Sequence, residues 1–483
     1  MTTPTEPAPS LRQRVLRSVD GPALDLAVFR VTVAVVIAAS ASVRVAVDWA
    51  ELPAATRVAP LGVGWLIPHL PITPTLVAGA RALLHAACLS AALGVFSRTS
   101  FALAALCAAY VLLIPQLGGA VFHDHHLLWF ALLLAASPCG DALSVDAWRA
   151  RRRGEPRPQS GPAHGLALRV GWLLVGLIYF FPGVHKLREL GLDWVLSDNL
   201  QHQLWWKWAQ DPSLLPRLRI DRYPALLHAL AGLTVLFELS FVVLVFFRRN
   251  RLWAVAAALA FHAGTHALMG IDFSVLYLCY TLFLPWSEWV SRWQARSPAS
   301  SPADARPPTN AAPHERVDDS PAMQRALRLV AAVGLLLVAG VGSAGALGAM
   351  QAYPFACYPT FAYDPGEHMP SLVVDVQRPG GPRERLPGEL YRPRGQRGLA
   401  LEWRLAGAYG DFSTARLSAW WRETARDPRL RSRLAAPCTV RFARAFVSVD
   451  PDQRASATGE PRDEVPLLEL PCEDGATPPR ARP

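Results

Sequence analysis

Long apolar runs constrain this chain more than any other feature of its sequence. Nine stretches are dominated by apolar residues, at about 24–47, 75–96, 101–119, 126–138, 166–185, 224–247, 252–268, 272–287 and 326–348. A helix of roughly 20 apolar residues crosses the hydrocarbon core of a bilayer. Only 18% of all residues are charged, against about 25% in soluble domains. We therefore expect a mainly α integral membrane protein, a polytopic bundle of about nine transmembrane helices.

The positions of the arginines predict how this bundle is oriented. Basic or arginine-bearing segments lie before the first run and after every second run. They are LRQRVLR, SRTS, AWRARRRGEPRPQ, RRNR and residues 289–325. Cytoplasmic loops of membrane proteins are enriched in Lys and Arg. With nine crossings, all five segments fall on one side, which we assign to the cytoplasm. The net charge of +10 then reflects membrane topology, and we expect no nucleic-acid partner.

The apolar pattern also predicts a division of the chain into segments. These are a cytoplasmic tail, the main transmembrane domain, a cytoplasmic linker, a final transmembrane helix and an extracytoplasmic domain, at residues 1–20, 21–290, 291–325, 326–350 and 351–483. The first residues lack the short apolar core and cleavage site of a signal peptide. Together with the arginine content, this pattern favours a multi-pass protein of a bacterial inner membrane.

The C-terminal segment is more polar than the rest and has a different periodicity. SLVVDV, ALEWRL and CTVRFARAFVSVD are typical of strands, and FSTARLSAWWRETARD is typical of a helix. We expect a small α+β domain. It holds Cys357, Cys438 and Cys472, so an oxidising compartment would allow at most one disulfide among them, and the sequence leaves the pair open.

Two ionisable segments stand at the predicted outer ends of helices. Lys186 ends the fifth run, in YFFPGVHK. Its amine could extend toward water along the helix end, or it could face the bundle interior, where desolvation would leave a neutral amine able to act as a base. Asp124 and His125 open the fourth run, within HDHH. An interfacial loop, a metal site or a catalytic or binding site would each explain this segment, but neighbouring residues cannot all face one ion, and we expect no metal centre.

Further polar residues interrupt the apolar helices, namely Arg30, His85, Arg169, Glu238, His262 and His266. Such residues are costly in a membrane and tend to mark function. Arg30 and Arg169 could pair with Asp25 or Glu238 as structural charges. His262 lies on a helix that runs outward, toward the side predicted for His125 and Lys186.

Four tryptophans follow Lys186 in the sequence, at Trp194, Trp205, Trp206 and Trp208. They could form an interfacial aromatic belt or a re-entrant lid over a site. We therefore expect a site on the outer side of the bundle, with Trp194 as one of its binding residues.

The order of several short motifs resembles that of the vitamin K-dependent γ-carboxylase-like family, also called the horizontally transferred transmembrane (HTTM) family. The motifs are LAVFR, DHHLLWFALL, YFFPGVHKLRELGLDWV, FELSF with Glu238, and FHAGTHALMGIDFS. They extend over about residues 20–290, and their order on successive helices makes the resemblance specific.

This resemblance implies a chemistry and assigns residues to it. Lys186 matches the lysine that deprotonates reduced vitamin K in the family's carboxylases, and His125 matches the histidine that stabilises developing negative charge. Oxygen then adds, the resulting alkoxide removes a γ-proton from a glutamate, the carbanion captures CO2, and the quinone leaves as its epoxide. The implied cofactor is a reduced, menaquinol-type vitamin K with O2 and CO2 as co-substrates, and the implied partners are membrane lipid, a lipid-soluble quinone and a peptide or protein substrate on the outer side.

The chain departs from the family pattern at two positions beside these residues. His185 stands in place of the first lysine of a Lys-Lys pair, and Asp124 stands in place of an asparagine. We expect His185, Asp124, His262 and Trp194 to bind substrate or cofactor. The alternative hypothesis is a non-enzymatic transporter, or a scaffold that presents the C-terminal domain.

Overall fold

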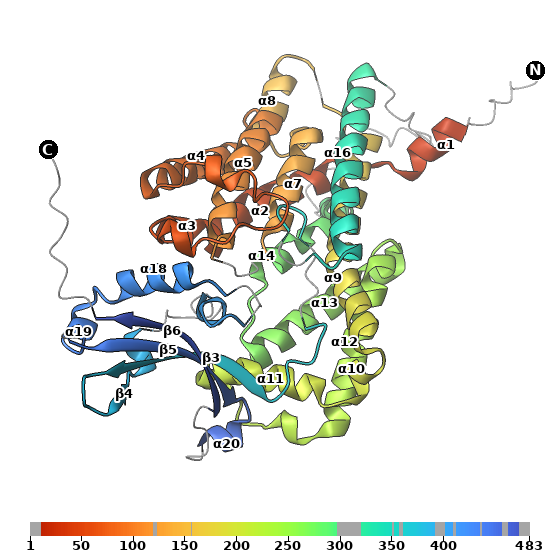
Figure 1. Ribbon diagram of the computed structural model, residues 1–483. Helices are drawn as coiled ribbons and strands as arrows, with labels where there is room; N and C mark the ends of the chain where they lie inside the picture. The colour runs from red at the N-terminus through yellow and green to blue at the C-terminus, as the bar shows by residue number, and fades with distance from the viewer. Residues whose placement is uncertain are drawn as a thin grey trace, which may run out of the picture.

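An apolar helical bundle and a small sheet domain make up the computed structural model of the chain (Figure 1). The structure describes residues 11–118, 123–155, 157–296, 320–349, 352–356, 361–391, 401–408, 412–434, 437–455 and 462–472. Most of the predicted cytoplasmic linker and the start of the N-terminal tail lie outside these residues, as does Cys357.

Seven helices are long and apolar enough to cross a membrane. They are α2 with α3 (Ala23–Ala39 and Ala41–Ala50), α4 (Pro74–Leu93), α5 with α6 (Ser97–Val111 and Leu113–Gln116), α9 (Pro162–Leu190), α12 (Pro224–Leu244), α13 (Arg248–Met269) and α16 (Pro321–Ala346). This confirms the helical membrane bundle. The other two predicted runs form shorter helices, α7 (His125–Ala136) and Ser274–Phe283, the latter made of α14 (Ser274–Tyr277) and the 3-10 helix η5 (Leu278–Phe283). The count of nine full-length spans is therefore not confirmed.

Helix α7 is enclosed by protein. Trp129 and Phe130 are completely buried, and the Phe130 ring lies 5.0 Å from that of Phe29 in α2. The Trp129 indole donates a hydrogen bond of 2.7 Å to the carbonyl oxygen of Pro354. A helix enclosed by other helices does not have to match the thickness of the bilayer, so hydropathy and length alone do not describe it.

The arginine-rich segments gather at one end of the bundle. The helices α1 (Leu11–Ser18) and α8 (Val145–Arg152) and the start of α16 lie together at the top of Figure 1. Two short strands join there, β1 (Gly21–Pro22) and β2 (Ser160–Gly161). Arg169 donates to the carbonyl oxygens of Ser18 and Val19 at 2.9 and 2.8 Å. It therefore fixes the N-terminal segment to α9.

The sheet domain is antiparallel, with the strand order β4-β3-β5-β6. Its strands are β3 (His368–Gln377), β4 (Arg383–Arg385), β5 (Thr439–Ser448) and β6 (Arg462–Pro471), and its helices include α18 (Thr414–Thr424), α19 (Pro428–Arg431) and α20 (Pro451–Ala455). Trp421 of α18 packs edge-on against Phe442 of β5, with ring centroids 5.1 Å apart. A disulfide joins Cys438 to Cys472, so one pair forms among the three cysteines.

The strand predictions for this domain are partly confirmed. SLVVDV lies in β3, CTVRFARAFVSVD contains β5, and α18 lies within the predicted helix. The prediction of a strand for ALEWRL is wrong, because residues 401–405 are helical. Leu401 and Leu405, four residues apart, both enter the domain core, which is the spacing of one helix face.

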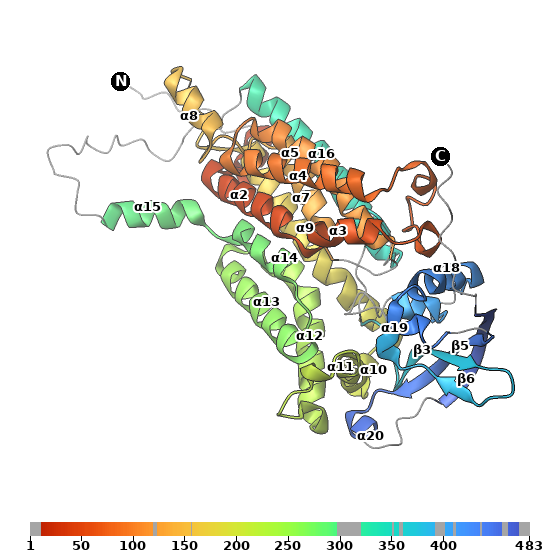
Figure 2. The same ribbon diagram turned by 90° about the vertical axis from the view of Figure 1, so that its left-hand side faces the viewer.

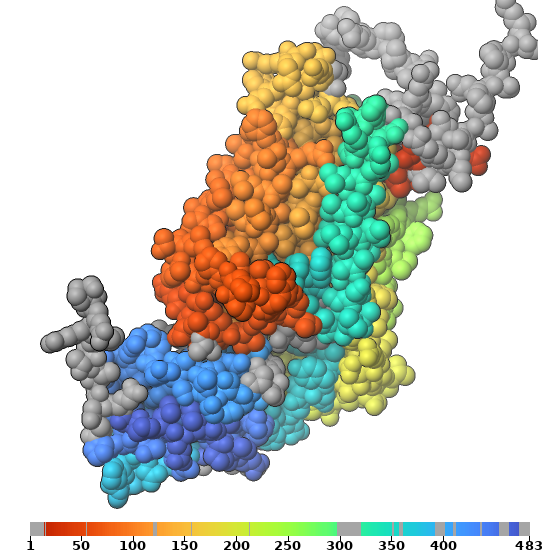
Figure 3. Space-filling model, turned by 45° about the horizontal axis from the view of Figure 1, so that its top comes forward, coloured from red at the N-terminus to blue at the C-terminus, as the bar shows by residue number. Residues whose placement is uncertain are grey.

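The sheet domain packs against the end of the bundle opposite the arginine-rich segments (Figure 2). Trp206 of α11 (Asn199–Gln210) donates a 2.7 Å hydrogen bond to the carbonyl oxygen of Gly366. Arg219 forms an ion pair of 2.9 Å with Asp452 of α20. Figure 3 shows the domain directly against the N-terminal helices, where α18 packs on the 3-10 helix η1 (Ala54–Thr56).

Candidate functional site

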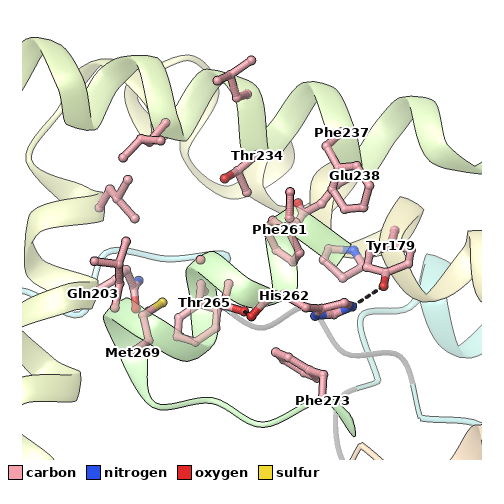
Figure 4. Close-up of a pocket in the computed structure, with 18 of the residues that line it drawn as sticks. Tyr179, Gln203, Thr234, Phe237, Glu238, Phe261, His262, Thr265, Met269 and Phe273 are labelled. Carbon is pink, nitrogen blue, oxygen red and sulfur yellow. Dashed lines mark hydrogen bonds between the residues drawn. The ribbon is translucent and has the colours of Figure 1, made fainter. Parts of the chain in front are cut away.

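A cavity of about 470 Å³ lies at the sheet-domain end of the bundle, among α9, α12, α13 and the loop before α7 (Figure 4). We call it the lysine cavity. Its wall is mainly aromatic and aliphatic, with a few polar groups that include Lys186, Glu238, His262 and Tyr179. This volume and composition are typical of sites for small organic ligands.

Lys186 and Glu238 form an ion pair in the wall of the lysine cavity. Both residues are at most 5% exposed, and the amine lies 2.8 and 2.9 Å from the two carboxylate oxygens. Lys186 lies on the buried face of α9, and Glu238 lies on the buried face of α12. The hypothesis that Lys186 extends toward water is therefore wrong: the carboxylate holds the amine inside the bundle.

Tyr179, His262 and Tyr280 form a second polar group in the same region. The Tyr179 hydroxyl lies 2.6 Å from His262 Nε2 and is hydrogen-bonded to the Tyr280 hydroxyl. The Tyr280 hydroxyl also lies 3.0 Å from His262 Nε2. His262 Nδ1 is buried and has no hydrogen-bond partner among the described residues. His262 is also one of the residues that line the lysine cavity.

The histidines before and at the start of α7 separate into two groups. His123 and His126 line the lysine cavity, whereas His125 does not. The His126 ring donates through Nε2 to the carbonyl oxygen of Val275 at 2.9 Å. The His125 ring packs edge-on against Tyr353, with centroids 5.2 Å apart. Burial lowers the pKa of His123, in the loop before α7, to about 4, so this imidazole is neutral near pH 7.

The two residues that depart from the family pattern lie outside the cavity wall. His185 donates through Nε2 to the carbonyl oxygen of Gly345 in α16, at 2.7 Å. Asp124 accepts a 2.8 Å hydrogen bond from the Ser40 hydroxyl. Neither residue lines the cavity, so both hold helices together in this structure.

The tryptophan segment, residues 194–208, borders the lysine cavity at the end nearest the sheet domain. Trp194, in α10 (Asp193–Leu196), lines the cavity, and its ring centroid lies 5.1 Å from the Lys186 amine. Its indole donates a 2.7 Å hydrogen bond to the carbonyl oxygen of Phe361, which also lines the cavity. We call α10, α11 and Phe361 the roof. Trp194 thus borders the cavity, whereas Trp205, Trp206 and Trp208 are not among its lining residues.

A second amine, that of the half-buried Lys207, lies in the roof. Lys207 of α11 lies 5.7 Å from the centroid of the Phe361 ring and donates to the side-chain oxygen of Gln210 at 3.3 Å. Burial lowers the pKa of this lysine to about 8. Lys207 was not predicted as a site residue from the sequence, because a lysine among tryptophans is as typical of a helix at the membrane interface as of a binding site.

The predicted pairing of the intramembrane arginines is wrong. Arg30 is completely buried, but its guanidinium donates to backbone carbonyl oxygens, at 2.9 Å to Cys139 and at 2.5 Å to Leu143. Asp25 accepts from the backbone of Ser287 at 2.8 Å. Arg30 therefore binds backbone carbonyl oxygens at the arginine-rich end and has no carboxylate partner among the described residues, while Glu238 lines the lysine cavity.

The wall between α12 and α13 is where the cavity meets the outer surface of the bundle. Leu233 of α12 lines the cavity and is also 61% exposed. Ala257 and Ala260 of α13 likewise line it and are exposed. A Cβ atom added to Gly264, a further lining residue, would have no atom within 4 Å. An apolar ligand could therefore enter between these two helices.

Tyr179 and Tyr280 were not among the site residues predicted from the sequence, and His126 was included there only as part of the HDHH segment. Tyr179 precedes Lys186 by two helical turns, which places both on one face of α9, and this spacing could have indicated it. Tyr280 lies in a short 3-10 helix, where sequence periodicity gives no face. Among the described residues, no group of three or more His, Cys, Asp or Glu side chains could hold a metal ion.

A comparison with protein-family models matches residues 16–289 to the HTTM domain. The match includes every element that lines the lysine cavity except Phe361. No curated protein and no solved structure matches the chain.

Proposed function

Because the chain belongs to the HTTM domain family, we propose that it is a membrane enzyme that deprotonates a reduced, lipid-soluble quinone, with Lys186 as the base. Reduced vitamin K of the menaquinol type is the substrate that we expect, with O2 and CO2 as co-substrates. One observation carries the proposal: the Lys186 amine is held by Glu238 in an apolar cavity large enough for a quinone ring.

The Lys186–Glu238 pair provides a way to prepare the base. In a cavity from which water is excluded, two charges are poorly solvated, so a shift to the neutral pair becomes less costly. A proton moves from the Lys186 ammonium to a Glu238 carboxylate oxygen, 2.8 Å away, and leaves a neutral amine beside a carboxylic acid. The amine then accepts the proton of the quinol hydroxyl and becomes an ammonium again. The quinol anion reacts with O2, and this reaction supplies the base strength that glutamate carboxylation requires.

The histidine and tyrosine group supports the same reaction. Tyr179 donates to His262 Nε2, which leaves the ring proton on Nδ1 and makes that nitrogen a donor toward the cavity. Such a donor stabilises negative charge that develops on a quinol oxygen. His126 also lines the cavity, but its Nε2–H is donated to the Val275 carbonyl oxygen, so its Nδ1 can only accept a hydrogen bond. The donor role therefore falls to His262, next to His125, which the family resemblance favours.

The bundle orientation belongs to the same proposal. We place the arginine-rich end in the cytoplasm of a bacterial inner membrane, and the roof and sheet domain on the extracytoplasmic side. A peptide or protein substrate would then approach the lysine cavity at the roof, and the quinol would enter from the bilayer between α12 and α13.

A quinol oxidation assay tests the proposal. The purified protein in lipid nanodiscs receives reduced menaquinone-type quinol, O2 and bicarbonate, with or without a glutamyl peptide, and epoxide and carboxylated product are measured. General base catalysis contributes ~10²–10⁴-fold, so we expect Lys186→Ala to lose at least about a hundredfold in epoxide formation. His185→Gln, at the neighbouring position outside the cavity, is the matched control.

The outcomes separate the hypotheses. Epoxide without carboxylated peptide supports the base and excludes the glutamyl substrate that was tested. Equal epoxide formation by the wild type and Lys186→Ala removes Lys186 from the mechanism. Absence of any quinol turnover favours the non-enzymatic transporter or scaffold.

A further inference from the structure

We propose that the arginine-rich end of the bundle carries a binding site for the phosphate headgroup of an anionic phospholipid. A second cavity, of about 450 Å³, lies there, and it shares no lining residue with the lysine cavity. Its wall comes from the start of α5, the loop before α8, α8 itself and the start of α16. We call it the arginine cavity.

Four arginines line the arginine cavity, namely Arg98 of α5, Arg149 of α8, and Arg153 and Arg157 of the segment that follows α8. Two carboxylates, Asp141 and Asp146, lie in the same wall. The guanidinium groups therefore outnumber the carboxylates, and the wall has a net positive charge. Guanidinium groups bind phosphate oxygens through paired N–H donors, which makes arginine the preferred residue for such sites.

Both carboxylates are occupied by structural contacts. Asp146 accepts hydrogen bonds from the backbone N–H groups of Phe96 and Ser97, at 3.0 and 2.8 Å, and so caps the start of α5. Asp141 accepts from His164 Nε2 at 3.0 Å. Arg157 lies 3.7 Å from Asp141, at the outer limit of an ion pair. The two carboxylates thus accept mainly from backbone and histidine N–H groups. Most of the guanidinium N–H groups in the wall therefore remain for a ligand.

Two of the arginines are well placed to provide that capacity. Arg98 donates to the carbonyl oxygens of Ala135 and Ala136, at 3.2 and 2.9 Å, and these bonds fix its guanidinium at the cavity. Arg149 lies over the Phe96 ring, 5.7 Å from the centroid. Within the part of the chain that the structure describes, no ion pair joins Arg149 to a carboxylate.

Apolar side chains at the rim favour a lipid over free phosphate. Phe96 lines the arginine cavity and is 67% exposed. Leu93 and Leu143, on the adjoining segments, are 55% and 60% exposed. The two segments meet where Gly94 lies against Ser144. Acyl chains could cover these side chains while the phosphate contacts the arginines, as in other basic pockets between transmembrane helices.

The test compares charge changes at two pairs of neighbouring arginines. Arg149→Gln/Arg153→Gln removes two positive charges that line the cavity, one in α8 and one at its C-cap, and Arg151→Gln/Arg152→Gln removes the same charge from residues of α8 that do not line the cavity. All four arginines are exposed, so we expect both variants to fold, and thermal unfolding checks this. Binding of fluorescent phosphatidylglycerol and phosphatidylcholine to the detergent-solubilised full chain is measured, with inorganic phosphate as the soluble competitor.

We expect the wild type to prefer phosphatidylglycerol and the cavity variant to bind it about tenfold more weakly, because each arginine near a headgroup contributes to its binding. The control variant should lose at most about twofold. Equal losses in both variants, or equal binding of the two lipids by the wild type, would overturn the proposal. Displacement by millimolar phosphate would assign the arginine cavity to a soluble phosphate and would exclude the lipid.

Discussion

At the scale of residues, the centre of the molecule is the contact between Lys186 and Glu238. The sequence placed both residues in apolar helices, but their pairing depends on how α9 packs on α12. Gly183 lets the two helices approach, because a Cβ atom at this position would lie 3.0 Å from the Cβ of Glu238. A hydropathy profile does not report contacts between helices. From the sequence, Glu238 was therefore predicted to be a structural charge.

The first prediction concerns the stability that this pair provides. Glu238→Leu leaves the Lys186 charge in the cavity without its carboxylate, so we expect the free energy of unfolding to fall by about 3–5 kcal/mol. The double variant Lys186→Met/Glu238→Leu removes both charges and should recover most of that loss. Thermal unfolding in nanodiscs measures both effects. If the double variant is no more stable than Glu238→Leu, the pair does not act as a unit.

The second prediction concerns the hydroxyl of Tyr179. Tyr179→Phe keeps the ring but leaves His262 Nε2 with one partner fewer, at a cost of about 1–3 kcal/mol, and we expect kcat for the quinol to fall about tenfold or more. Tyr277→Phe is the control, because the Tyr277 ring packs on His262 with centroids 6.0 Å apart but its hydroxyl is not in the hydrogen-bonded group. A similar kcat for both variants would argue against a role for the Tyr179 hydroxyl.

At the scale of elements, apolar helices differ in what surrounds them. The long helices α4, α12 and α13 have many exposed apolar residues, as a lipid-facing helix requires, whereas α7 is almost wholly buried. The sequence predicted helices for both kinds correctly. The sequence could not predict that α7 is shorter than a full span. A helix that other helices enclose does not have to match the thickness of the bilayer, and this enclosure is a property of the packing.

The third prediction concerns the opening between α12 and α13. Gly264→Phe places a ring in the open space beside the cavity, so we expect it to exclude part of a long quinol tail. KM for a long-tailed quinol should rise about tenfold, which corresponds to roughly two excluded methylene groups. KM for a quinol without a tail should stay unchanged. Ala263→Phe, on an exposed neighbour that does not line the cavity, is the control, and an equal rise in both variants would contradict this entry route.

At the scale of the whole molecule, α10 and α11 of the roof lie between the sheet domain and the helices α12 and α13 (Figure 2). Arg219, in the segment that follows the roof, donates to Asp221 in η4 (Ile220–Arg222) at 2.7 Å and to Asp452 in α20 of the sheet domain at 2.9 Å. Trp205 of α11 donates to the same Asp221 at 2.9 Å, so these contacts connect the roof to the sheet domain. The hydrogen bonds from Arg219 lower the pKa of Asp452 below its ordinary value. Burial by itself raises the pKa of Asp221, but the hydrogen bonds from Arg219 and Trp205 outweigh it, and that pKa is also lowered.

The fourth prediction is an acid-sensitive attachment of the sheet domain. Both carboxylates have a lowered pKa in the folded state, so they stabilise the attachment above the ordinary pKa of about 4, and this contribution is lost as the pH falls through the lowered values. We expect hydrogen exchange in α11 to be unchanged between pH 8 and 5 and to increase, after correction for the intrinsic rate, below about pH 4. Arg219→Gln should show the increased exchange already at pH 7. Equal protection of α11 at pH 7 and at pH 3.5 in the wild type would exclude this attachment.

The sequence by itself determined that the chain is a helical membrane protein with a sheet domain at its C-terminal end, because apolar length, arginine placement and strand periodicity are local properties. It also indicated Lys186 and His262 as site residues, since polar residues in apolar helices are rare. Only the tertiary structure decided which groups meet: Glu238 with Lys186, Tyr179 and Tyr280 with His262, and His126 rather than His125 in the wall of the lysine cavity. These pairings depend on how each helix is rotated and on which residues let two helices approach closely. The spacing of residues within one helix does not predict a contact between two different helices.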